Sequence, residues 1–321
     1  MHIPSDHGPI PDRRPPRRAP AAVIWGAAMA LLLIALGGWV ITSGTEEHQE
    51  SKPSLSTGAL SLPWPRDGQA SVIDTRTGAS GTSGEQKPVP IASVTKVMTA
   101  HVILSGHPLR RGQSGPVITV DQQAQDESHS SVESTVRVEA GQRLTQRQLL
   151  EMLLLPSGNN IARLLARWDA GSEAAFVTKM NRAAAALDMR RTTYTDASGI
   201  GPTTMSTSDD QLRLARKVMR DATFRAIVAT PEVAVGGPTG TLANTNRLLG
   251  TAGNVGIKTG SSTPAGGALM WATTTGRGSD AGLVLGVVLH QKPNTTPAEG
   301  LDAAFQAAER LAEAARKGGR S

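Results

Sequence analysis

The stretch IASVTKVMTAHVIL, residues 91–104, places a serine and a lysine three positions apart at the start of an apolar run. Residues three apart lie on the same face of a helix, so Ser93 and Lys96 are predicted to point the same way. An unpaired ammonium is costly to bury. Lys96 therefore either reaches solvent along its aliphatic stem or has a task inside the protein. A lone S-x-x-K arises by chance on the order of once in a chain of this size, so the rest of the sequence has to decide.

The composition excludes several classes of function. The chain has 321 residues, a net charge of +6, 3% aromatic residues and no cysteine. Disulfides, thiolate catalysis and cysteine metal sites are therefore ruled out. Despite the positive charge, no compact Lys/Arg run carries interleaved aromatics, so nucleic acid is not an expected partner. No H-E-x-x-H or similar ligand spacing is present, and we expect neither a metal nor a cofactor.

The N-terminal region reads as a membrane anchor. Residues 1–20 form a Pro-rich tail with a cluster of arginines, and residues 21–42 carry no charge. About 20 apolar residues span a bilayer as a helix. Arginines mark the cytoplasmic side, so the remainder of the chain is expected outside the cell, on the cell-wall side of the membrane. The lipid bilayer is thus an expected partner through residues 21–42.

A cleaved signal peptide is the alternative for this segment. Its apolar core usually spans about 7–15 residues, and no A-x-A site follows residue 42. These features favour the uncleaved anchor. The polar, Ser/Thr/Gly-rich residues 43–62 then form a flexible tether to a domain at 63–317, followed by a short tail at 318–321.

The outer domain shows strand signals at both ends and helix signals between them. We therefore expect an α/β (α+β) fold in which both ends of the domain share one antiparallel sheet, flanked by helices and with an all-helical block inserted. A loop is expected at 79–88, Ser172 as a helix N-cap, and Ser208 with Gln211 as a capping box. The predicted strands are 70–78, 253–260, 266–275 and 281–291. Helices are predicted at 145–155, 171–188 and 296–317. Three more are predicted to start at Ser93, to open with residues 159–168, and to run from Ser208 to about residue 219.

Two further motifs accompany the first. Ser157-Gly158-Asn159 stands between two predicted helices, and Lys258-Thr259-Gly260 stands on the first strand of the C-terminal group. Alone, Ser157 reads as a helix N-cap and the second motif as a strand entering a turn. The ordered set S-x-x-K, S-x-N, K-T-G, at a helix start, an interhelical loop and a strand edge, is far more specific than any member.

With this set, the chain resembles the serine-type D-alanyl-D-alanine carboxypeptidases, which are low-molecular-mass penicillin-binding proteins of the penicillin-recognising serine enzyme fold. The resemblance runs from about Ser71 to the final helix. It implies a β-lactamase/transpeptidase-like fold, a peptidoglycan stem peptide ending in D-Ala-D-Ala as substrate, and β-lactam antibiotics as ligands. Two departures concern substrate affinity: Asn160 replaces a common acidic residue, and His290-Gln291-Lys292 stands where many relatives have a carboxylate-binding arginine.

The motif residues receive roles through this resemblance and through their chemistry. Ser93 is the expected nucleophile and Lys96 its base, since burial and a second cation, Lys258, both lower a lysine pKa. The resemblance makes Ser157 a proton relay and gives the oxyanion hole to the backbone N–H groups of Ser93 and Ser261. The substrate-binding set comprises Asn159, Lys258, Thr259, Gly260 and Ser261.

Other reactions remain as alternatives. A transpeptidase differs only in the acceptor of the acyl group, and a sensor would keep the pocket without turnover. A class A β-lactamase needs a glutamate beyond Ser157, and none stands between Glu173 and Glu232. His101, Asn181 and Tyr194 are expected to be structural.

Overall fold

The computed structural model describes residues 60–276 and 281–318. These residues belong to one compact unit of the chain, Pro53–Ser321. The tail at 1–20, the anchor predicted at 21–42 and most of the tether lie outside the described residues, as do residues 319–321. Within the described ranges, no helix combines the length and apolar character that crossing a bilayer requires.

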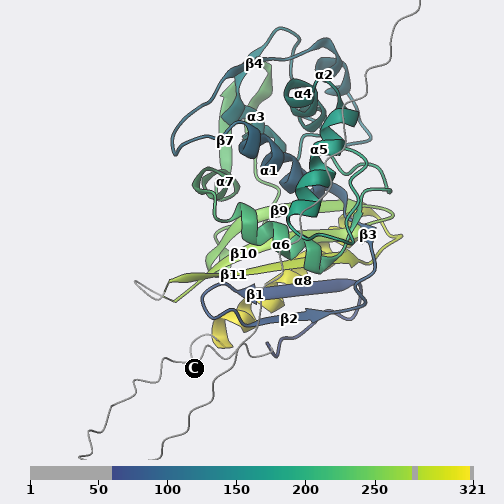
Figure 1. Ribbon diagram of the computed structural model, residues 1–321, viewed down its shortest axis with the longest axis vertical. Coiled ribbons are helices and arrows are strands. Elements are labelled where there is room, and N and C mark those ends of the chain that lie inside the picture. Colours follow the sequence, from purple (N-terminus) through teal and green to yellow (C-terminus); the bar gives the residue numbers. More distant parts are fainter. Residues whose placement is uncertain (1–59, 277–280, 319–321) are drawn as a thin grey trace, which may run out of the picture. The chain divides into compact units, whose positions relative to one another are not determined.

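A five-stranded antiparallel sheet forms the base of the domain (Figure 1). Its first and last strands in the sequence are direct neighbours, with Gln69 opposite Leu289 and Asp74 opposite Val284. This pairing confirms that both ends of the domain share one sheet. In spatial order the strands are β2 (Ser80–Ser83), β1 (Gln69–Asp74), β11 (Gly282–Gln291), β10 (Gly266–Thr275) and β9 (Asn254–Ser262).

The loop predicted at 79–88 is wrong in part, because β2 lies within it and pairs antiparallel with β1. The β2 residues are Ser, Gly, Thr and Ser, and they are exposed or half-buried at the sheet edge. Backbone hydrogen bonds hold this strand, and apolar packing contributes little. A search for alternating apolar residues therefore has nothing to detect there.

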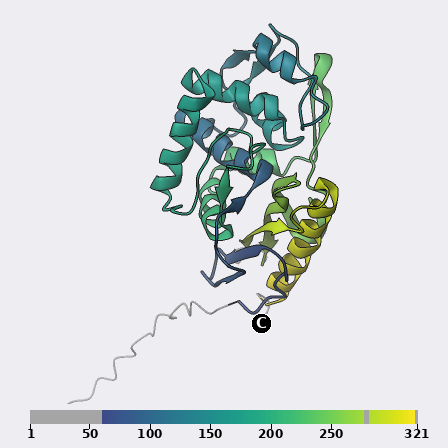
Figure 2. The same cartoon turned by 90° about the vertical axis from the view of Figure 1, so that its right-hand side faces the viewer.

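Alternate residues of the sheet enter two separate cores. Leu269 and Trp271 of β10 pack with helix α8 (Pro297–Gly318), while Met270 and Ala272 pack with the helical block. Figures 1 and 2 show α8 on one face of the sheet and the other helices on the opposite face. This is the arrangement that the period of two in a strand produces when both faces are covered.

The inserted block is mostly helical, but it also contains small sheets, so the prediction of an all-helical block needs correction. The paired strands are β3 (Val89–Pro90) with β6 (Met205–Ser206), β4 (Val117–Thr119) with β5 (Arg143–Thr145), and β7 (Glu232–Gly236) with β8 (Gly240–Ala243). The α-helices are α1 (Lys96–Gly106), α2 (Gln122–Glu127), α3 (Gln146–Leu154), α4 (Asn159–Ala170), α5 (Glu173–Ala186), α6 (Ser208–Val218) and α7 (Ala222–Val228). Short 3-10 turns are η1 (Ala92–Thr95), η2 (Gly237–Thr239) and η3 (Thr251–Gly253).

Helix caps confirm one sequence prediction and contradict another. Ser172 caps α5, as expected. The cap of α6 is Thr207 instead of Ser208, because Thr207 is extended and its hydroxyl accepts from the Asp210 N–H at 3.2 Å. The Ser208 hydroxyl is instead 2.8 Å from that of Ser71 on β1, a contact between distant parts of the chain that local spacing cannot reveal.

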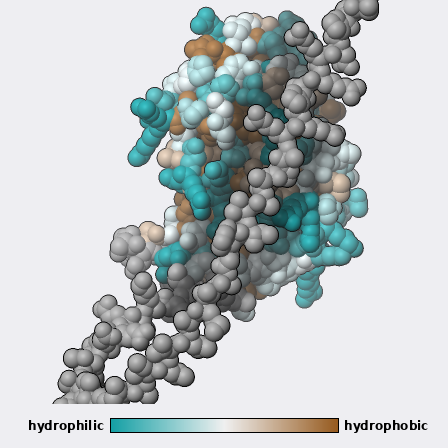
Figure 3. All heavy atoms as spheres, viewed as in Figure 1, coloured by the Kyte–Doolittle hydropathy of each residue, from teal (hydrophilic) through white to brown (hydrophobic). Residues whose placement is uncertain are grey.

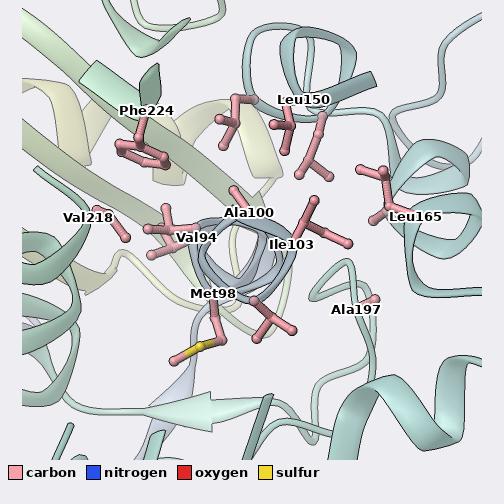
Figure 4. Close-up of a cluster of buried hydrophobic side chains, with 14 of the residues drawn as sticks. Val94, Met98, Ala100, Ile103, Leu150, Leu165, Ala197, Val218 and Phe224 are labelled. Carbon is pink, nitrogen blue, oxygen red and sulfur yellow. The ribbon is translucent and has the colours of Figure 1, made fainter. Parts of the chain in front are cut away.

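Helix α1 runs through the middle of the block and is apolar on nearly every side. Figure 4 shows buried side chains around this helix; those labelled from outside η1 and α1 are Leu150, Leu165, Ala197, Val218 and Phe224. A helix that is hydrophobic all round belongs in a core. By contrast, the surface in Figure 3 is largely hydrophilic, with smaller hydrophobic areas between.

Candidate active site

Ser93 sits on a tight turn at the junction of the helical block and the sheet. The turn, η1, precedes α1, and Ala92 within it has a left-handed φ of 46°. Gly199 (φ 79°) lies directly against this turn, and a Cβ there would overlap the carbonyl oxygen of Ala92. Strained backbone held by its surroundings is typical of functional sites. The Ser93 side chain is thus presented on a rigid support.

The Lys96 ammonium group lies in a buried pocket with three oxygen partners. Its Nζ is 2.7 Å from Ser93 Oγ, 2.5 Å from Asn159 Oδ1 and 2.9 Å from the carbonyl oxygen of Ser198. The two carbonyl-type oxygens can only accept. A neutral Lys96 therefore donates to both and keeps its lone pair for the Ser93 O–H. The geometry matches a base poised to take the serine proton.

The surroundings of Lys96 favour this neutral form. Burial lowers its pKa well below the usual range, and the charge of Lys258 lowers it further. Arg163 acts in the same direction, while the carboxylates of Asp196 and Glu133 oppose it. Both causes inferred from the sequence, desolvation and the second lysine, are present.

Ser157 does not cap the helix that follows it. The N-cap of α4 is Gly158, and Ser157 itself adopts a left-handed φ of 71°. Its hydroxyl is buried and has no hydrogen-bond partner among the residues that the structure describes. Buried polar atoms are nearly always paired. Within the described residues this hydroxyl is therefore free to bond with an added group.

The K-T-G motif lies on β9, the edge strand of the sheet. Lys258 is buried, and its Nζ donates to the carbonyl oxygen of Thr259 at 3.0 Å. Burial lowers its pKa to about 7. A Cβ at Gly260 would come within 3.0 Å of the Ser93 and Val94 nitrogens. The lack of a side chain at Gly260 thus lets β9 approach the Ser93 turn. The sequence did not suggest this reason for a glycine here. Ser261 follows Gly260 on the same strand.

The predicted site residues therefore differ in how directly they contact Ser93 and Lys96. Ser93, Lys96 and Asn159 are joined by direct hydrogen bonds. Lys258 acts on Lys96 through its charge, and Gly260 packs against the serine turn. The Thr259 hydroxyl lies 2.7 Å from that of Thr245 and 3.4 Å from Lys258 Nζ.

Several polar groups of the site were missed from the sequence. Glu133 accepts from the Asn159 amide at 2.7 Å and from Arg163 at 2.7 Å. Asp196 accepts from the N–H of Ser198 at 2.8 Å. This contact helps to hold Ser198, whose carbonyl oxygen accepts from Lys96. The four-residue spacing of Asn159 and Arg163 signals a shared helix face. Glu133 and Asp196 lie on loops and carry no comparable signal.

The residues expected to be structural make hydrogen bonds away from Ser93 and Lys96. The Asn181 amide donates to the carbonyl oxygen of Tyr194 at 2.8 Å, and the Tyr194 hydroxyl lies 3.1 Å from the Gln211 amide. His101 Nδ1 is 3.4 Å from the Ser105 hydroxyl on the same helix. In residues 60–276 and 281–318, no cluster of three or more His, Asp or Glu side chains could hold a metal ion.

Lys292, which follows the last strand, is exposed and has a left-handed φ of 47°. Hydrogen bonds from Thr296 and, to a smaller extent, the charge of Lys292 lower the pKa of Glu299. The positive charge of Lys292 thus lies near α8.

The sequence matches one protein-family model, peptidase S11, D-alanyl-D-alanine carboxypeptidase, over residues 65–291. It is 34% identical over 209 residues to a D-alanyl-D-alanine carboxypeptidase of Streptomyces sp. strain K15, covering 60% of this chain and 71% of that protein. It is 35% identical over 217 residues to a D-alanyl-D-alanine endopeptidase of Pseudomonas aeruginosa, covering 65% and 68% of the two chains.

Solved structures agree with the fold. The Streptomyces K15 DD-transpeptidase superposes with a TM-score of 0.68 at 28% identity, over 79% of this chain and 98% of that one. Penicillin-binding protein 6B of Escherichia coli superposes with a TM-score of 0.65 at 23% identity, over 79% and 81%. The second likeness concerns the fold alone.

Proposed function

This chain belongs to the peptidase S11 family of D-alanyl-D-alanine carboxypeptidases, and we propose that it removes the terminal D-alanine from peptidoglycan stem peptides. It is a serine peptidase that acts on peptidoglycan and a target of β-lactams. The observation that carries the assignment is the 2.7 Å contact between Ser93 Oγ and the buried Lys96 Nζ. A serine hydroxyl needs such an adjacent base to act as a nucleophile.

The proposed reaction proceeds through an acyl-enzyme. Lys96 takes the proton from Ser93 as Oγ attacks the carbonyl carbon of the penultimate D-alanine. The peptide C–N bond then breaks, the terminal D-alanine leaves as the amine, and the buried Ser157 hydroxyl relays the proton from Lys96 to the leaving nitrogen. The backbone N–H groups of Ser93 and Ser261 stabilise the oxyanion. Water then attacks the carbonyl carbon of the acyl-enzyme. Its proton passes back through the same groups to Ser93 Oγ, and the shortened peptide is released.

The edge strand supplies the proposed substrate cradle. An extended peptide can add to the free edge of β9 through backbone hydrogen bonds. Lys258 and Thr259 would hold its terminal carboxylate, a negatively charged group that suits the buried ammonium. Asn159 would offer the second hydrogen of its amide to the peptide backbone.

The relatives bear the names carboxypeptidase, endopeptidase and transpeptidase. A transpeptidase differs from the two hydrolases in the acceptor of the acyl group, an amine in place of water. With a pentapeptide ending in D-Ala-D-Ala, we expect the purified domain to release free D-alanine. A product joined to an added amine, without hydrolysis, would identify a transpeptidase. β-Lactam acylation without either product would identify a sensor.

A class A β-lactamase is disfavoured by the state of Glu133, the carboxylate that contacts Asn159 of the S-x-N motif. Burial alone would raise the pKa of Glu133, but hydrogen bonds from Arg163 and Asn159 outweigh it and lower the pKa. A carboxylate with its proton affinity reduced in this way is a poor base for a deacylating water. We therefore expect slow release of a bound β-lactam.

The charge of Lys258 predicts a pH dependence of substrate capture. Because its pKa is about 7, Lys258 loses its positive charge as the pH rises through that value. The value of kcat/KM reports the free enzyme. For a peptide with a free C-terminal carboxylate, the part of kcat/KM that depends on carboxylate binding should fall by about 10–100-fold above this pH. The matched control is the same peptide with a C-terminal amide; an equal fall for both peptides would contradict the assigned role.

We also propose that residues 21–42 anchor the enzyme in the cell membrane with the catalytic domain on the wall side, on the evidence of their uncharged composition and the preceding arginines. The full-length protein should then stay in the membrane fraction after an alkaline wash. Recovery of a soluble form that begins near residue 43 would instead show a cleaved signal peptide.

A further inference from the structure

A carboxylate without a role in the steps above lies directly behind Asn159. Glu133 Oε2 accepts from Asn159 Nδ2 at 2.7 Å, and Glu133 Oε1 accepts from Arg163 at 2.7 Å. Its side chain is 14% exposed. Asn159 and Arg163 stand one turn apart on α4, so both reach Glu133 from the same helix face. The carboxylate is thereby held in one place.

The loop that carries Glu133 is tied to the start of α4. The Asn160 side chain accepts from the Val136 N–H at 3.0 Å and donates to the Val136 carbonyl oxygen at 2.8 Å. The Asn159 N–H donates to the carbonyl oxygen of Ser134 at 2.8 Å. Asn160, the residue that departs from the common acidic choice in relatives, therefore helps to place Glu133.

The contact with Glu133 determines which way the Asn159 amide faces. An asparagine amide has an accepting oxygen and a donating NH2 group, whereas an ionised carboxylate only accepts. Glu133 thus engages the NH2 end, and the oxygen end turns to Lys96. Lys96 must then use one N–H for Asn159 and another for the Ser198 carbonyl, which leaves its lone pair for Ser93.

We propose that Glu133 is a positioning residue that acts through Asn159 to direct the lone pair of Lys96 at the Ser93 hydroxyl. The proposal rests on the role of Lys96 as the base, stated above. Glu133 touches neither Ser93 nor Lys96 by a hydrogen bond in the described structure, so its effect is exerted through the intervening amide.

Glu133 also acts on Lys96 through its charge, and this provides a readout that a purely structural residue would lack. The charged groups facing Lys96 are Lys258 on β9, Arg163 on α4, Asp196 on the loop after α5, and Glu133. Glu133 raises the pKa of Lys96. Removing its negative charge should therefore move the acid limb of the acylation rate to lower pH, since Lys96 would become neutral at a lower pH.

Two variants separate orientation from charge. Glu133→Ala removes both the acceptor and the charge, whereas Glu133→Gln keeps an acceptor oxygen and removes only the charge. The measurement is the second-order rate constant for acylation by a fluorescent penicillin from pH 4 to 10. We expect both variants to shift the acid limb to lower pH. On the plateau, Glu133→Ala should lose about 10–100-fold, as for other residues that orient a reacting group, and Glu133→Gln less.

Glu127→Ala is the matched control. Glu127 also pairs with Arg163, accepting from its Nε at 2.9 Å, and its side chain is 17% exposed. It has no contact with Asn159 among the described hydrogen bonds, so its loss should leave both the plateau rate and the acid limb unchanged. Equal losses in Glu127→Ala and Glu133→Ala would overturn the proposal, because they would point to the ion-pair network as a whole.

A double variant tests the route through Asn159. If Glu133 acts through that amide, Glu133→Ala should cost nothing further on the plateau in an Asn159→Ala background. Additive losses, or a wild-type rate and acid limb in Glu133→Ala, would overturn the proposal. Failure to release D-alanine would contradict the proposed carboxypeptidase reaction alone. Acylation by penicillin reports the proton transfer from Ser93 to Lys96 and does not depend on hydrolysis.

Discussion

Replacement of Ser93 by alanine is expected to abolish acylation by β-lactams and to reduce D-alanine release by about 10⁴–10⁶-fold, the range seen when the nucleophile of a serine peptidase is removed. The reason is chemical: no other hydroxyl lies within 3 Å of Lys96 Nζ among its hydrogen-bond partners in the described structure. Mass spectrometry of the wild-type protein after treatment with penicillin should locate the adduct on Ser93.

The structure offers a matched control for this variant. Ser105 is an exposed serine near the other end of the same helical segment, and Ser105→Ala should label and turn over as the wild type does. The buried, unpaired hydroxyl of Ser157 is the rival nucleophile. An adduct that maps to Ser157, or that persists undiminished in Ser93→Ala, would refute the assignment of the nucleophile.

Lys96→Ala is expected to have the second largest effect, a loss of about 10²–10⁴-fold in the acylation rate, the usual contribution of a positioned general base. Ser93 would remain on its turn, but its proton would have no acceptor. Because the truncation removes the aminopropyl end of the lysine side chain, a small primary amine such as propylamine should restore part of the rate. Ser93→Ala should show no such rescue.

The pH dependence of the rescue gives a second, independent check. A base works only when neutral, so the wild-type rate should rise through the lowered pKa of Lys96, which burial and Lys258 bring down. The free amine keeps a pKa of about 10.4, so the rescued rate, divided by the wild-type rate, should keep rising up to that pH. A rescued rate that parallels the wild type at every pH would exclude Lys96 as the base.

Much of the domain could be predicted from local patterns. Strand β10 occupies the predicted residues, 266–275, because its apolar run is long and glycines bound it on one side. Helix α5 begins after Ser172, since a capping serine acts within one turn. The short strands of the inserted block were missed, because four of these six strands have only two or three residues, too few to show a period. Strands β3 and β6 pair across a long stretch of chain, as Val89 does with Ser206, and local periodicity cannot reveal such a pairing.

The sequence by itself determined the family and the three motifs and predicted which residues react, because these depend on residue types at close or ordered spacing. Only the tertiary structure decided how the motifs work together. It showed that the Ser198 carbonyl oxygen accepts from Lys96 and that Glu133 accepts from the Asn159 amide. It also showed that Gly260 is needed for the close approach of β9 to the Ser93 turn. Such contacts join loops that are distant in the chain, and their energies depend on burial and distance, which no local pattern encodes.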